Sequence, residues 1–421
     1  MKAFAEYMDS RTSSAGSGIE LNEEQQSAVD KIRAFLRGDD QFFGLYGYAG
    51  TGKTTTIHEA LRGAVERVAM SAPTHKAVGV LARMDHDASC EFATIHRLLG
   101  CRRQYKDGEI FYAPDLTKDQ AIHGFDVVVI DECSMIGEKM WDWVQDAVRG
   151  NDIKIIVMGD PMQLPPVSDG EVSPTFDLPS ATLTRIMRHE GVIESAATAM
   201  RKAVDADELP LAEDGQDEHG EVVNLHQSDF IERMMGDLDR CKVLAYTNDA
   251  VDWINDHIRM EVFGEEARPF EPRERLVLVE SYSTDLSLLH TETEIQVDAA
   301  HRAKRMGLDC WQVMVTDEHG GKHELFCLDD GQKGEFLRKL RKARDRGKAG
   351  GGWKPYYDLK EGFARVRPGW ATTIHKSQGS TYDHVYLIQT NVLSTAGYDH
   401  ELCAMLLYVG YSRARKKLIL S

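Results

Sequence analysis

An α/β fold built on parallel sheets is predicted by two features of the sequence. Short runs rich in β-branched residues alternate with stretches of helical character, which is typical of parallel sheets. In the first part of the chain the expected strands are 42–46, 67–72, 125–130 and 153–158. A glycine-rich loop also follows the first of these strands and opens a helix, as in nucleotide-binding α/β domains. The same alternation returns later in the chain, so we expect two related sheets facing each other.

Composition narrows the class of protein. A length of 421 residues suggests about three domains, and a net charge of −18 argues against a protein coated in nucleic acid but not against a local basic groove. Seven dispersed cysteines without a C-x-x-C pair indicate reduced thiols. The longest apolar run, 402–409, is shorter than the ~18 residues of a membrane helix, and no secretion signal is visible. We expect a soluble, cytoplasmic protein without a membrane partner.

The chain begins with an expected flexible tail over 1–18, followed by a helix over 21–36. Asn22 is the expected N-cap of this helix, and Gln25 lies in its first turns. The glycine-rich loop then matches G-x-x-x-x-G-K-[ST] in full, with the residues Gly47, Gly50, Thr51, Gly52, Lys53, Thr54 and Thr55 in and beside it. This pattern predicts a site for a nucleoside triphosphate.

Each type of residue in this loop has a physical task. The glycines let successive backbone N–H groups point at phosphate oxygens, and the N-terminus of the following helix favours the same anion. Lys53 adds a cation for the β- and γ-phosphates, and the Thr54 hydroxyl is placed to ligate Mg²⁺. A chance glycine-rich turn is the alternative, but it would not need a buried strand before it and a helix after it.

A protruding hairpin is expected at 101–114, because Asp107-Gly108 is a strong signal for a type I′ turn. A turn there pairs Tyr105 with Ile110, Gln104 with Phe111, and Arg103 with Tyr112. The aromatic side chains can either anchor the ribbon to its domain or meet a ligand.

Two further motifs follow the strands at 125–130 and 153–158. Asp131 and Glu132 come directly after four apolar residues, where Asp131 is suited to hold Mg²⁺ and Glu132 to deprotonate an attacking water. The sequence GDPMQLPPV at 159–167 places Gln163 where it could report the state of a γ-phosphate. A proline-bounded turn is the equally acceptable interpretation of that second motif.

The second half of the chain repeats the α/β pattern with an interruption. A strand at 241–246 and a helix at 249–262 come first, and the pattern resumes at Trp370 with strands at 384–388 and 417–420. Between them, 275–315 alternates polar and apolar residues in short strands, as in a small barrel. The segment 331–354 then carries nine Lys or Arg against two Asp or Glu. It is either a solvated helical arm or a clamp that closes over a bound strand.

The motifs, taken in order, resemble those of superfamily 1 helicases. The matching stretches are LNEEQQSAV (21–29), the phosphate loop, SAPTHKAV (71–78), TIHRLLG (94–100), DECSM (131–135), GDPMQLPPV (159–167), LTRIMRH (183–189), TIHKSQGSTYD (373–383) and YVGYSRARKKL (408–418). The set is similar to the RecD/Dda-like 5′→3′ branch, superfamily 1B, and within it to the phage Dda-type enzymes.

This resemblance implies a fold and an activity. The expected fold is two RecA-like P-loop domains, with a β-hairpin pin inserted in the first and an SH3-like barrel with a basic arm in the second. The expected bounds are 19–190 for the first domain, 191–274 with 365–421 for the second, and 275–364 for the barrel. The implied activity is ATP- and Mg²⁺-dependent translocation on single-stranded DNA, 5′ to 3′, with unwinding of duplex.

The resemblance also implies roles for individual residues. Gln25 would read the adenine, Gly379 would lie between strand and nucleotide, and Arg188 and Arg413 would be arginine fingers. For Arg413, a salt-bridged helix residue is the plainer alternative. The residues implied to contact the DNA strand are Thr74, His75, Lys76, Thr94, His96, Thr373, His375, Lys376 and Ser377. Such hydroxyl, imidazole and ammonium groups suit phosphates and carry little sequence information.

The expected partners are single-stranded DNA and fork duplex, with a single-strand binding protein as a further candidate, and a monomer is the expected functional unit. The source would be a prokaryotic or phage-infected cell. A translocase that mainly strips proteins from DNA is one alternative, and a P-loop switch or kinase is another. The second-domain arginines and the paired Thr-x-His motifs argue against a switch or kinase.

Overall fold

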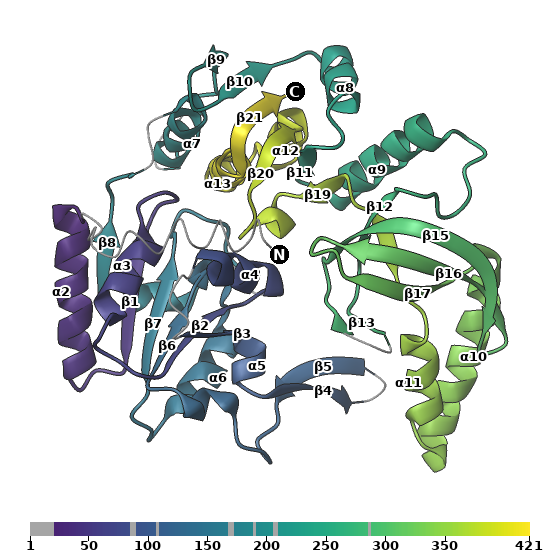
Figure 1. Cartoon of the computed structure of the whole chain (residues 1–421), viewed down its shortest axis with the longest axis horizontal. Coiled ribbons are helices and arrows are strands. Elements are labelled where there is room, and N and C mark those ends of the chain that lie inside the picture. The colour runs from purple at the N-terminus through teal and green to yellow at the C-terminus, as the bar shows by residue number, and fades with distance from the viewer. Residues whose placement is uncertain are drawn as a thin grey trace, which may run out of the picture.

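The computed structural model describes residues 21–84, 90–106, 109–166, 172–187, 191–204, 209–284 and 288–421. The expected tail at 1–18, the Asp107-Gly108 turn, the end of the 159–167 motif and Arg188 lie outside the described residues. Three larger sheets organise the described chain, and Figure 1 shows them as separate bodies.

The first sheet is six-stranded and fully parallel. Its strand order is β3 (Cys90–Thr94), β2 (Val68–Ala72), β6 (Val127–Ile130), β7 (Lys154–Gly159), β1 (Phe42–Gly47) and β8 (Ser180–Leu183). The four strands predicted from apolar runs are all present within two residues of their expected bounds. Such runs are recognisable because both faces of a parallel sheet are covered, so nearly every side chain is buried.

Helices cover both faces of the first sheet. One face packs against α2 (Glu23–Arg37), α3 (Lys53–Leu61) and α4 (His75–Met84), and the other against α5 (Ile95–Leu98) and α6 (Glu138–Val148). The predicted cap of α2 is confirmed: Asn22 Oδ1 accepts from the Gln25 backbone N–H at 2.9 Å, and Gln25 Oε1 accepts from the Asn22 N–H at 3.0 Å. This reciprocal pair is a capping box.

The predicted hairpin is present as β4 (Cys101–Lys106) and β5 (Glu109–Pro114). Its register is the one that the Asp-Gly signal predicts, with Gln104 opposite Phe111 and Arg103 opposite Tyr112. The ribbon leaves the first sheet after α5 and extends toward α11 in Figure 1. Tyr112 is 47% exposed, so about half of its surface is accessible to solvent.

The second sheet is also six-stranded and mostly parallel. Its order is β19 (Ala371–Thr373), β11 (Cys241–Ala245), β20 (Tyr382–Leu387), β21 (Ala414–Leu420), β10 (Glu221–Asn224) and β9 (Gly215–Gln216), and only β9 is antiparallel to its neighbour. One face packs against α7 (Val192–Lys202), α12 (Gln389–Ala396) and α13 (His400–Ser412), and the other against α8 (Gln227–Met235) and α9 (Asn248–Phe263).

The third sheet, here called the inserted sheet, is five-stranded and antiparallel. Its order is β17 (Lys322–Leu328), β16 (Leu308–Asp317), β15 (Glu294–Arg305), β12 (Arg275–Leu278) and β18 (Val366–Pro368), with the short pair β13 (Tyr282–Ser283) and β14 (Leu288–Leu289) beside it.

Two expectations for this region are corrected. The strands are not all short, since β15 has 12 residues and β16 has 10, and they continue past 315 to Leu328. The sheet also takes in β18, beyond the expected boundary at 364, because β18 pairs with β12. A three-residue strand separated by about 90 positions from its partner leaves no periodic signal in the sequence.

The basic segment forms α10 (Lys333–Arg346), followed after a glycine-rich turn by α11 (Lys354–Glu361). Phe336 and Leu340 pack toward Leu308 of the inserted sheet and toward Phe363, which follows α11. The side chains of Arg341, Lys342, Arg344 and Arg346 are exposed. The segment is therefore an amphipathic helix whose cationic side faces outward. Whether it closes over a strand stays a prediction.

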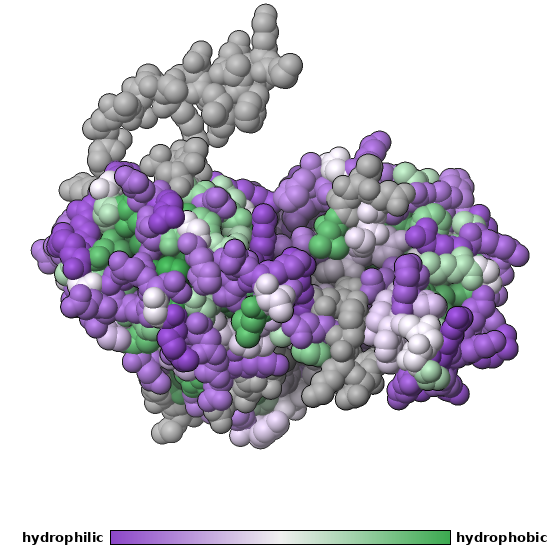
Figure 2. Space-filling model, turned by 90° about the horizontal axis from the view of Figure 1, so that it is seen from below, coloured by the Kyte–Doolittle hydropathy of each residue, from purple (hydrophilic) through white to green (hydrophobic). Residues whose placement is uncertain are grey.

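Figure 2 shows a face that is mostly hydrophilic, with apolar residues in small separate groups. Five cysteines are buried, and Cys90 and Cys101 are half-buried. Among the described residues no helix combines the length and apolarity needed to cross a bilayer. The apolar run at 402–409 lies instead inside α13, where it packs on the second sheet.

Candidate active site and strand-contact surface

The phosphate loop connects β1 to α3 in a tightly curled form. Gly50 and Gly52 have φ of 82° and 83°, a left-handed backbone that glycine adopts without strain. A Cβ on Gly47 would lie 2.7 Å from the Leu183 carbonyl oxygen, so this position also requires glycine. The Lys53 ammonium donates to the carbonyl oxygens of Gly47 at 2.7 Å and Tyr48 at 3.1 Å, which holds it over the loop.

Helix α2 supports this loop from outside. The Gln25 side chain is buried, and its Nε2 donates to the Thr51 carbonyl oxygen at 3.1 Å. Because its Oε1 accepts in the capping box, both ends of the Gln25 amide are engaged within the protein. Thr54 and Thr55 follow in the first turn of α3, where they are half-buried.

Asp131 and Glu132 leave the end of β6 beside the phosphate loop. Burial raises the pKa of Asp131, while the charge of Lys53 opposes the shift. Glu132 has φ of 54° and ψ of 43°, a left-handed conformation that is uncommon for a residue other than glycine. Strained backbone of this kind collects at functional sites. It turns the chain sharply after β6 into the short 3₁₀ turn Cys133–Met135.

Two sheets together set the charge of Glu132. Burial and the neighbouring Asp131 raise its pKa to about 7, and the cations Arg413 and Lys53 act against them. Lys53 belongs to the first sheet and Arg413 follows α13 of the second. A carboxylate with a pKa near neutrality, next to a cationic phosphate loop, is suited to accept a proton from water.

Arg413 itself is 5% exposed and held by the second sheet. Its guanidinium donates to the carbonyl oxygens of Val409 at 3.1 Å and Ser380 at 3.2 Å, and to Ser412 Oγ at 3.0 Å. Among the described residues its hydrogen-bond partners are these three neutral oxygens. These three bonds fix the position of the guanidinium, and its charge acts on Glu132.

Asp160, at the end of β7, joins the two sheets through hydrogen bonds. Its Oδ2 accepts from the Tyr408 hydroxyl on α13 at 2.5 Å and from the Ala49 N–H of the phosphate loop at 3.2 Å. Its Oδ1 accepts from the Met162 N–H at 3.0 Å, which shapes the loop that carries Gln163. Burial and Asp160 together raise the pKa of Tyr408 well above its usual value, so the phenol stays a donor.

A second contact across the same junction involves the phosphate loop directly. The Arg201 guanidinium, on α7, lies 3.5 Å from the centre of the Tyr48 ring. Both residues line a cavity of ≈ 410 Å³ that opens beside the loop, together with Ile193, Tyr408 and Arg415 from the second sheet. The wall of this cavity therefore comes from both sheets.

The other predicted nucleotide residues lie near this junction. Gln163 is buried, and its Oε1 has no hydrogen-bond partner among the described residues. Gln378 Nε2 donates to the Leu164 carbonyl oxygen at 3.4 Å, which links the two motif loops. The backbone N–H of Met187 donates to the Gly50 carbonyl oxygen at 2.9 Å, so the chain reaches the phosphate loop immediately before Arg188.

Gly379 lies between Glu132, of the predicted nucleotide site, and α4, which carries predicted strand-contact residues. It has φ of 70°, and a Cβ built on it would lie 3.4 Å from Ala77 Cβ and 3.7 Å from Glu132 Oε1. Ala77 belongs to α4, the helix that begins with His75 and Lys76. Both distances are ordinary van der Waals contacts, so it is the left-handed φ that favours glycine at this position, where the chain passes between Glu132 and α4.

The predicted strand-contact residues divide into two groups. Thr94, Thr373 and Ser377 are buried, and their hydroxyls serve the fold: Thr94 Oγ1 caps α5, Thr373 Oγ1 accepts from the Lys376 N–H, and Ser377 Oγ donates to the Ile374 carbonyl oxygen. Thr74 Oγ1 likewise accepts from the Ala77 N–H at the start of α4. For these four, the side chains shape the loops.

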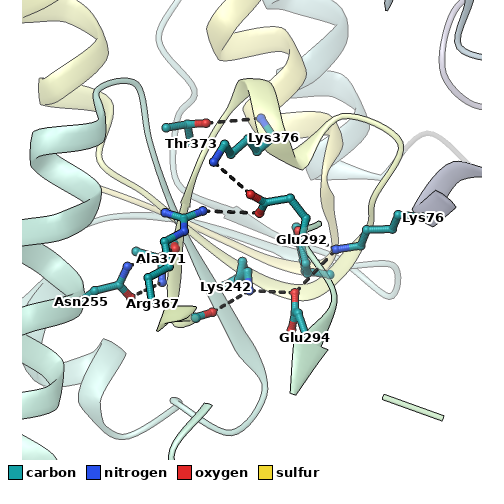
Figure 3. A network of polar contacts seen from close by, with 11 residues as sticks. Lys76, Lys242, Asn255, Glu292, Glu294, Arg367, Ala371, Thr373 and Lys376 are labelled. Atoms are coloured by element: carbon teal, nitrogen blue, oxygen red, sulfur yellow. Dashed lines mark hydrogen bonds and ion pairs between the residues drawn. The ribbon is translucent and has the colours of Figure 1, made fainter. Parts of the chain in front are cut away.

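The imidazoles and ammonium groups form the second group. His96 and His375 are half-buried, whereas His75 is exposed to solvent over part of its side chain; desolvation lowers the pKa of each, to about 4 for His75, which also lies beside His290. Lys76 and Lys376 both contact glutamates of the inserted sheet region, an arrangement shown in Figure 3. The ion pairs with Glu292 and Glu294, the Tyr408–Asp160 bond and the Arg201–Tyr48 contact were all missed by sequence reasoning. No motif spacing marks contacts between such distant positions.

Comparison with known proteins identifies the chain at the level of sequence families. Residues 20–227 match the family model of an AAA domain, and residues 368–421 match that of a UvrD-like helicase C-terminal domain. The chain is 26% identical to the ATP-dependent DNA helicase dda of Enterobacteria phage T4, over 94% of this chain and 98% of the relative. It is 27% identical to the RecD subunit of the RecBCD enzyme of Mycolicibacterium smegmatis, over 64% of this chain and 46% of the relative.

Solved structures share the fold. A structure of Pif1 helicases described as unwinding forked duplex DNA superposes with a TM-score of 0.56 at 17% identity, over 96% of this chain and 92% of that chain. A Bacteroides Pif1 helicase with ADP-AlF3 and single-stranded DNA gives 0.55 at 16% identity, over the same shares. With the ordered motifs, the sequence matches show that the chain belongs to superfamily 1B of the helicases, as one of its Dda-like members.

Proposed function

We propose that this chain is an ATP-dependent DNA helicase that moves along single-stranded DNA and unwinds duplex. The observation that carries the proposal is the composition of the Glu132 site. The phosphate loop and both carboxylates come from the first sheet, while Arg413 comes from the second and acts on the charge of Glu132. Such a site is completed only when the two sheets meet, which couples nucleotide chemistry to their relative movement.

ATP and Mg²⁺ fit the residues present. The curled loop requires glycine at Gly47 and favours it at Gly50 and Gly52, as a phosphate cradle does. Loop N–H groups and Lys53 would hold the phosphates, and Thr54 with Asp131 would hold Mg²⁺. The bound Mg²⁺ would supply charge neutralisation at the β- and γ-phosphate oxygens. Gln25, which supports the loop at Thr51, is the proposed contact for the adenine.

The remaining nucleotide residues receive roles from their positions. Glu132 is the proposed base. Gln163 is the proposed reporter of the γ-phosphate, because its buried Oε1 has no hydrogen-bond partner in the part of the chain that the structure describes. Arg413 and Arg188 are the proposed arginine fingers, with the Met187–Gly50 hydrogen bond in favour of Arg188. Gly379 is the proposed relay between Glu132 and α4.

On the strand side, the proposed contacts with single-stranded DNA are His75, Lys76, His96, His375 and Lys376, with backbone contacts at the loops that Thr74, Thr94, Thr373 and Ser377 shape. We propose 5′-to-3′ movement from the family alone. The hairpin is the proposed pin at the fork, the inserted sheet the proposed SH3-like barrel, and α10 the proposed clamp. The two parallel sheets are the proposed RecA-like domains of a functional monomer.

The test compares ATP hydrolysis with and without single-stranded DNA, followed by unwinding of tailed and blunt duplexes. The proposal expects strong stimulation by single-stranded DNA and unwinding of a duplex with a 5′ tail. Stimulation without unwinding would instead indicate a translocase that displaces proteins. Hydrolysis indifferent to DNA would indicate a nucleotide switch or kinase and overturn the proposal.

A further inference from the structure

A short loop of the inserted sheet lies over the proposed strand-contact residues. It is the segment 290–294, which follows β14 and ends at the first residue of β15, and it is here called the covering loop. It contacts His75, Lys76 and Lys376, which belong to α4 of the first sheet and to the turn after β19 of the second. Five consecutive residues thus meet three of the side chains proposed to hold DNA.

The first contact is a ring stack. The imidazoles of His75 and His290 are nearly parallel, at 14°, with centroids 3.3 Å apart. A stacked ring covers the face that His75 would otherwise offer to a base or sugar. The covering loop therefore occupies an aromatic contact as well as charged ones.

The second contact is Glu294, which holds two lysines at once. Its Oε1 lies 2.8 Å from Lys242 Nζ and 3.6 Å from Lys76 Nζ. The lysines differ in environment: the Lys242 side chain is 6% exposed and also donates to the Gly369 carbonyl oxygen, whereas Lys76 is 32% exposed. Burial opposes ionisation of Glu294, but Lys242 and Lys76 hold its pKa below the usual value, so it is a carboxylate.

Glu292 repeats this arrangement with other partners. Its carboxylate lies 2.9 Å from Lys376 Nζ and 3.4 Å from Arg367 Nη2, with side-chain exposures of 41% for Lys376 and 17% for Arg367. Glu292 has φ of 63°, and this left-handed turn places it beside Lys376. Figure 3 shows both carboxylates lying between the cations of the network. Each glutamate thus joins one sheltered cation to one accessible lysine.

We propose that Glu292 and Glu294 occupy the positions of two backbone phosphates and are exchanged for them when a single strand binds. The inference rests on the proposed function, and it adds that Lys76 and Lys376 are occupied by the protein's own carboxylates until the strand arrives. The ligand class is a polyanionic sugar–phosphate backbone, because the two lysines provide point charges and no base-reading fork.

The two-cation arrangement makes the exchange feasible. A carboxylate left alone in a buried site is strongly disfavoured. When Lys76 and Lys376 leave, however, Glu294 keeps Lys242 and Glu292 keeps Arg367, so neither carboxylate loses its sheltered partner. The bonds that break are those to the more exposed lysines, which are the weak class of ion pair. A strand phosphate then replaces each carboxylate at the lysine.

The test uses Glu292→Gln/Glu294→Gln, which keeps side-chain size and removes both competing charges. The matched control is Glu261→Gln/Glu280→Gln, which removes the same charge from two exposed glutamates elsewhere. Affinity for a fluorescent oligothymidylate is measured from low to high salt. We expect the first variant to bind about 3–30-fold tighter than the wild type, two released ion pairs being worth that much.

The salt dependence separates local exchange from general repulsion. Direct competition leaves the number of phosphates neutralised unchanged, so the slope, about 0.7 per phosphate, should be the same in wild type and variant. A gain in affinity caused only by the smaller negative net charge of the protein would appear in the control variant too. It would also fade at high salt, because salt shortens the screening length. Equal affinity of wild type and variant, or an equal gain in the control, would overturn the inference.

Two further measurements keep the outcomes distinct. The single variants Glu292→Gln and Glu294→Gln are measured in the same way, and thermal melting shows whether each variant is folded, so that an unfolded double variant does not decide the matter. If neither single variant binds the oligonucleotide more tightly than the wild type, the exchange is contradicted. If wild type and variants alike bind no single strand, the proposed function fails. If the wild type binds and unwinds while the variants gain nothing, only the exchange fails.

Discussion

The nucleotide side and the strand side of the same junction hold their charges in different ways. On the nucleotide side, Lys53 rests on backbone carbonyl oxygens and Arg413 on carbonyl and hydroxyl oxygens. Neither cation has a carboxylate ion pair among the described residues. On the strand side, Lys76 and Lys376 are both paired with glutamates.

This difference indicates that the nucleotide side is preorganised for its ligand, whereas the strand side is not. Cations held by neutral oxygens keep their full charge for an incoming phosphate and need no rearrangement, which is the preorganisation that catalysis requires. Cations held by carboxylates must exchange partners first, and this makes binding selective for polyanions and reversible. A motor needs a fixed chemical centre and a grip that releases, and the two sides divide these properties between them.

The largest expected effect tests the fixed side. Lys53→Ala should abolish hydrolysis, because the cation over the loop is lost, and Glu132→Gln should bind ATP while turning over about 10²–10⁴-fold more slowly. Nucleotide binding by a fluorescent ATP analogue and hydrolysis by phosphate release check both. Near-normal turnover by Glu132→Gln would show that the base is another group.

The next effect tests whether the second sheet belongs to the chemical centre. Arg413→Ala should lower DNA-stimulated turnover about 10³-fold with a smaller change in nucleotide affinity, because the guanidinium acts on the transferring phosphoryl group. Lys416→Ala, which removes an exposed cation paired with Asp383, is the matched control and should be nearly silent. Since Arg413 also holds Val409 and Ser380, thermal melting and Arg413→Lys separate lost folding from lost chemistry. An intact kcat in a folded Arg413→Ala protein would confine the centre to the first sheet.

The third effect separates the motor from the proposed pin. Joining Arg103 to Tyr112 through Gly-Gly removes most of β4 and β5 but leaves both sides of the junction intact. DNA-stimulated hydrolysis should survive while unwinding of a tailed duplex is lost, since a translocating strand then meets no rigid obstacle. Stopped-flow unwinding beside steady-state ATPase makes the comparison. Wild-type unwinding by the shortened chain would mean that strands part elsewhere.

The smallest effect concerns pH. Glu132 must be ionised to act as a base, and its pKa is raised to about 7, so the rate should fall nearly tenfold per unit below pH 7. For stability the sign is opposite: a raised carboxyl pKa favours the protonated folded state, so stability declines as the pH rises from 4.5 through 7. Glu132→Gln should remove that loss, about 1–3 kcal/mol at pH 8. Melting temperatures are measured at pH 5 and pH 8. An equal change between the two pH values in wild type and Glu132→Gln would contradict this assignment of the pH dependence to Glu132.

Sequence reasoning predicted what is local and periodic. Four strands of the first parallel sheet and three of the second, the Asn22 N-cap of α2 and the hairpin register follow from apolar runs, a capping residue and an Asp-Gly turn. The phosphate loop and the carboxylate pair are likewise encoded in contiguous residues. Such features need no knowledge of what lies across the fold.

The features that sequence reasoning missed join distant segments through single side chains. Tyr408 reaches Asp160, and Arg201 reaches Tyr48, only because α13 and α7 pack where they do. Glu292 and Glu294 resemble any surface glutamates until the fold places the covering loop beside Lys376 and Lys76. Strand β18 has three residues, too few for a period to show.

The buried cysteines have a practical consequence for watching this molecule move. Burial raises the pKa of Cys101 to about 11 and of Cys133, Cys241 and Cys327 to about 12, and it raises the pKa of Cys310 and Cys403 too. Dye maleimides react with the thiolate, which these residues scarcely form at neutral pH. A cysteine placed at the exposed Thr291 of the covering loop, with Cys90 replaced by serine, should therefore take a fluorophore selectively and report optically on the loop as a strand arrives.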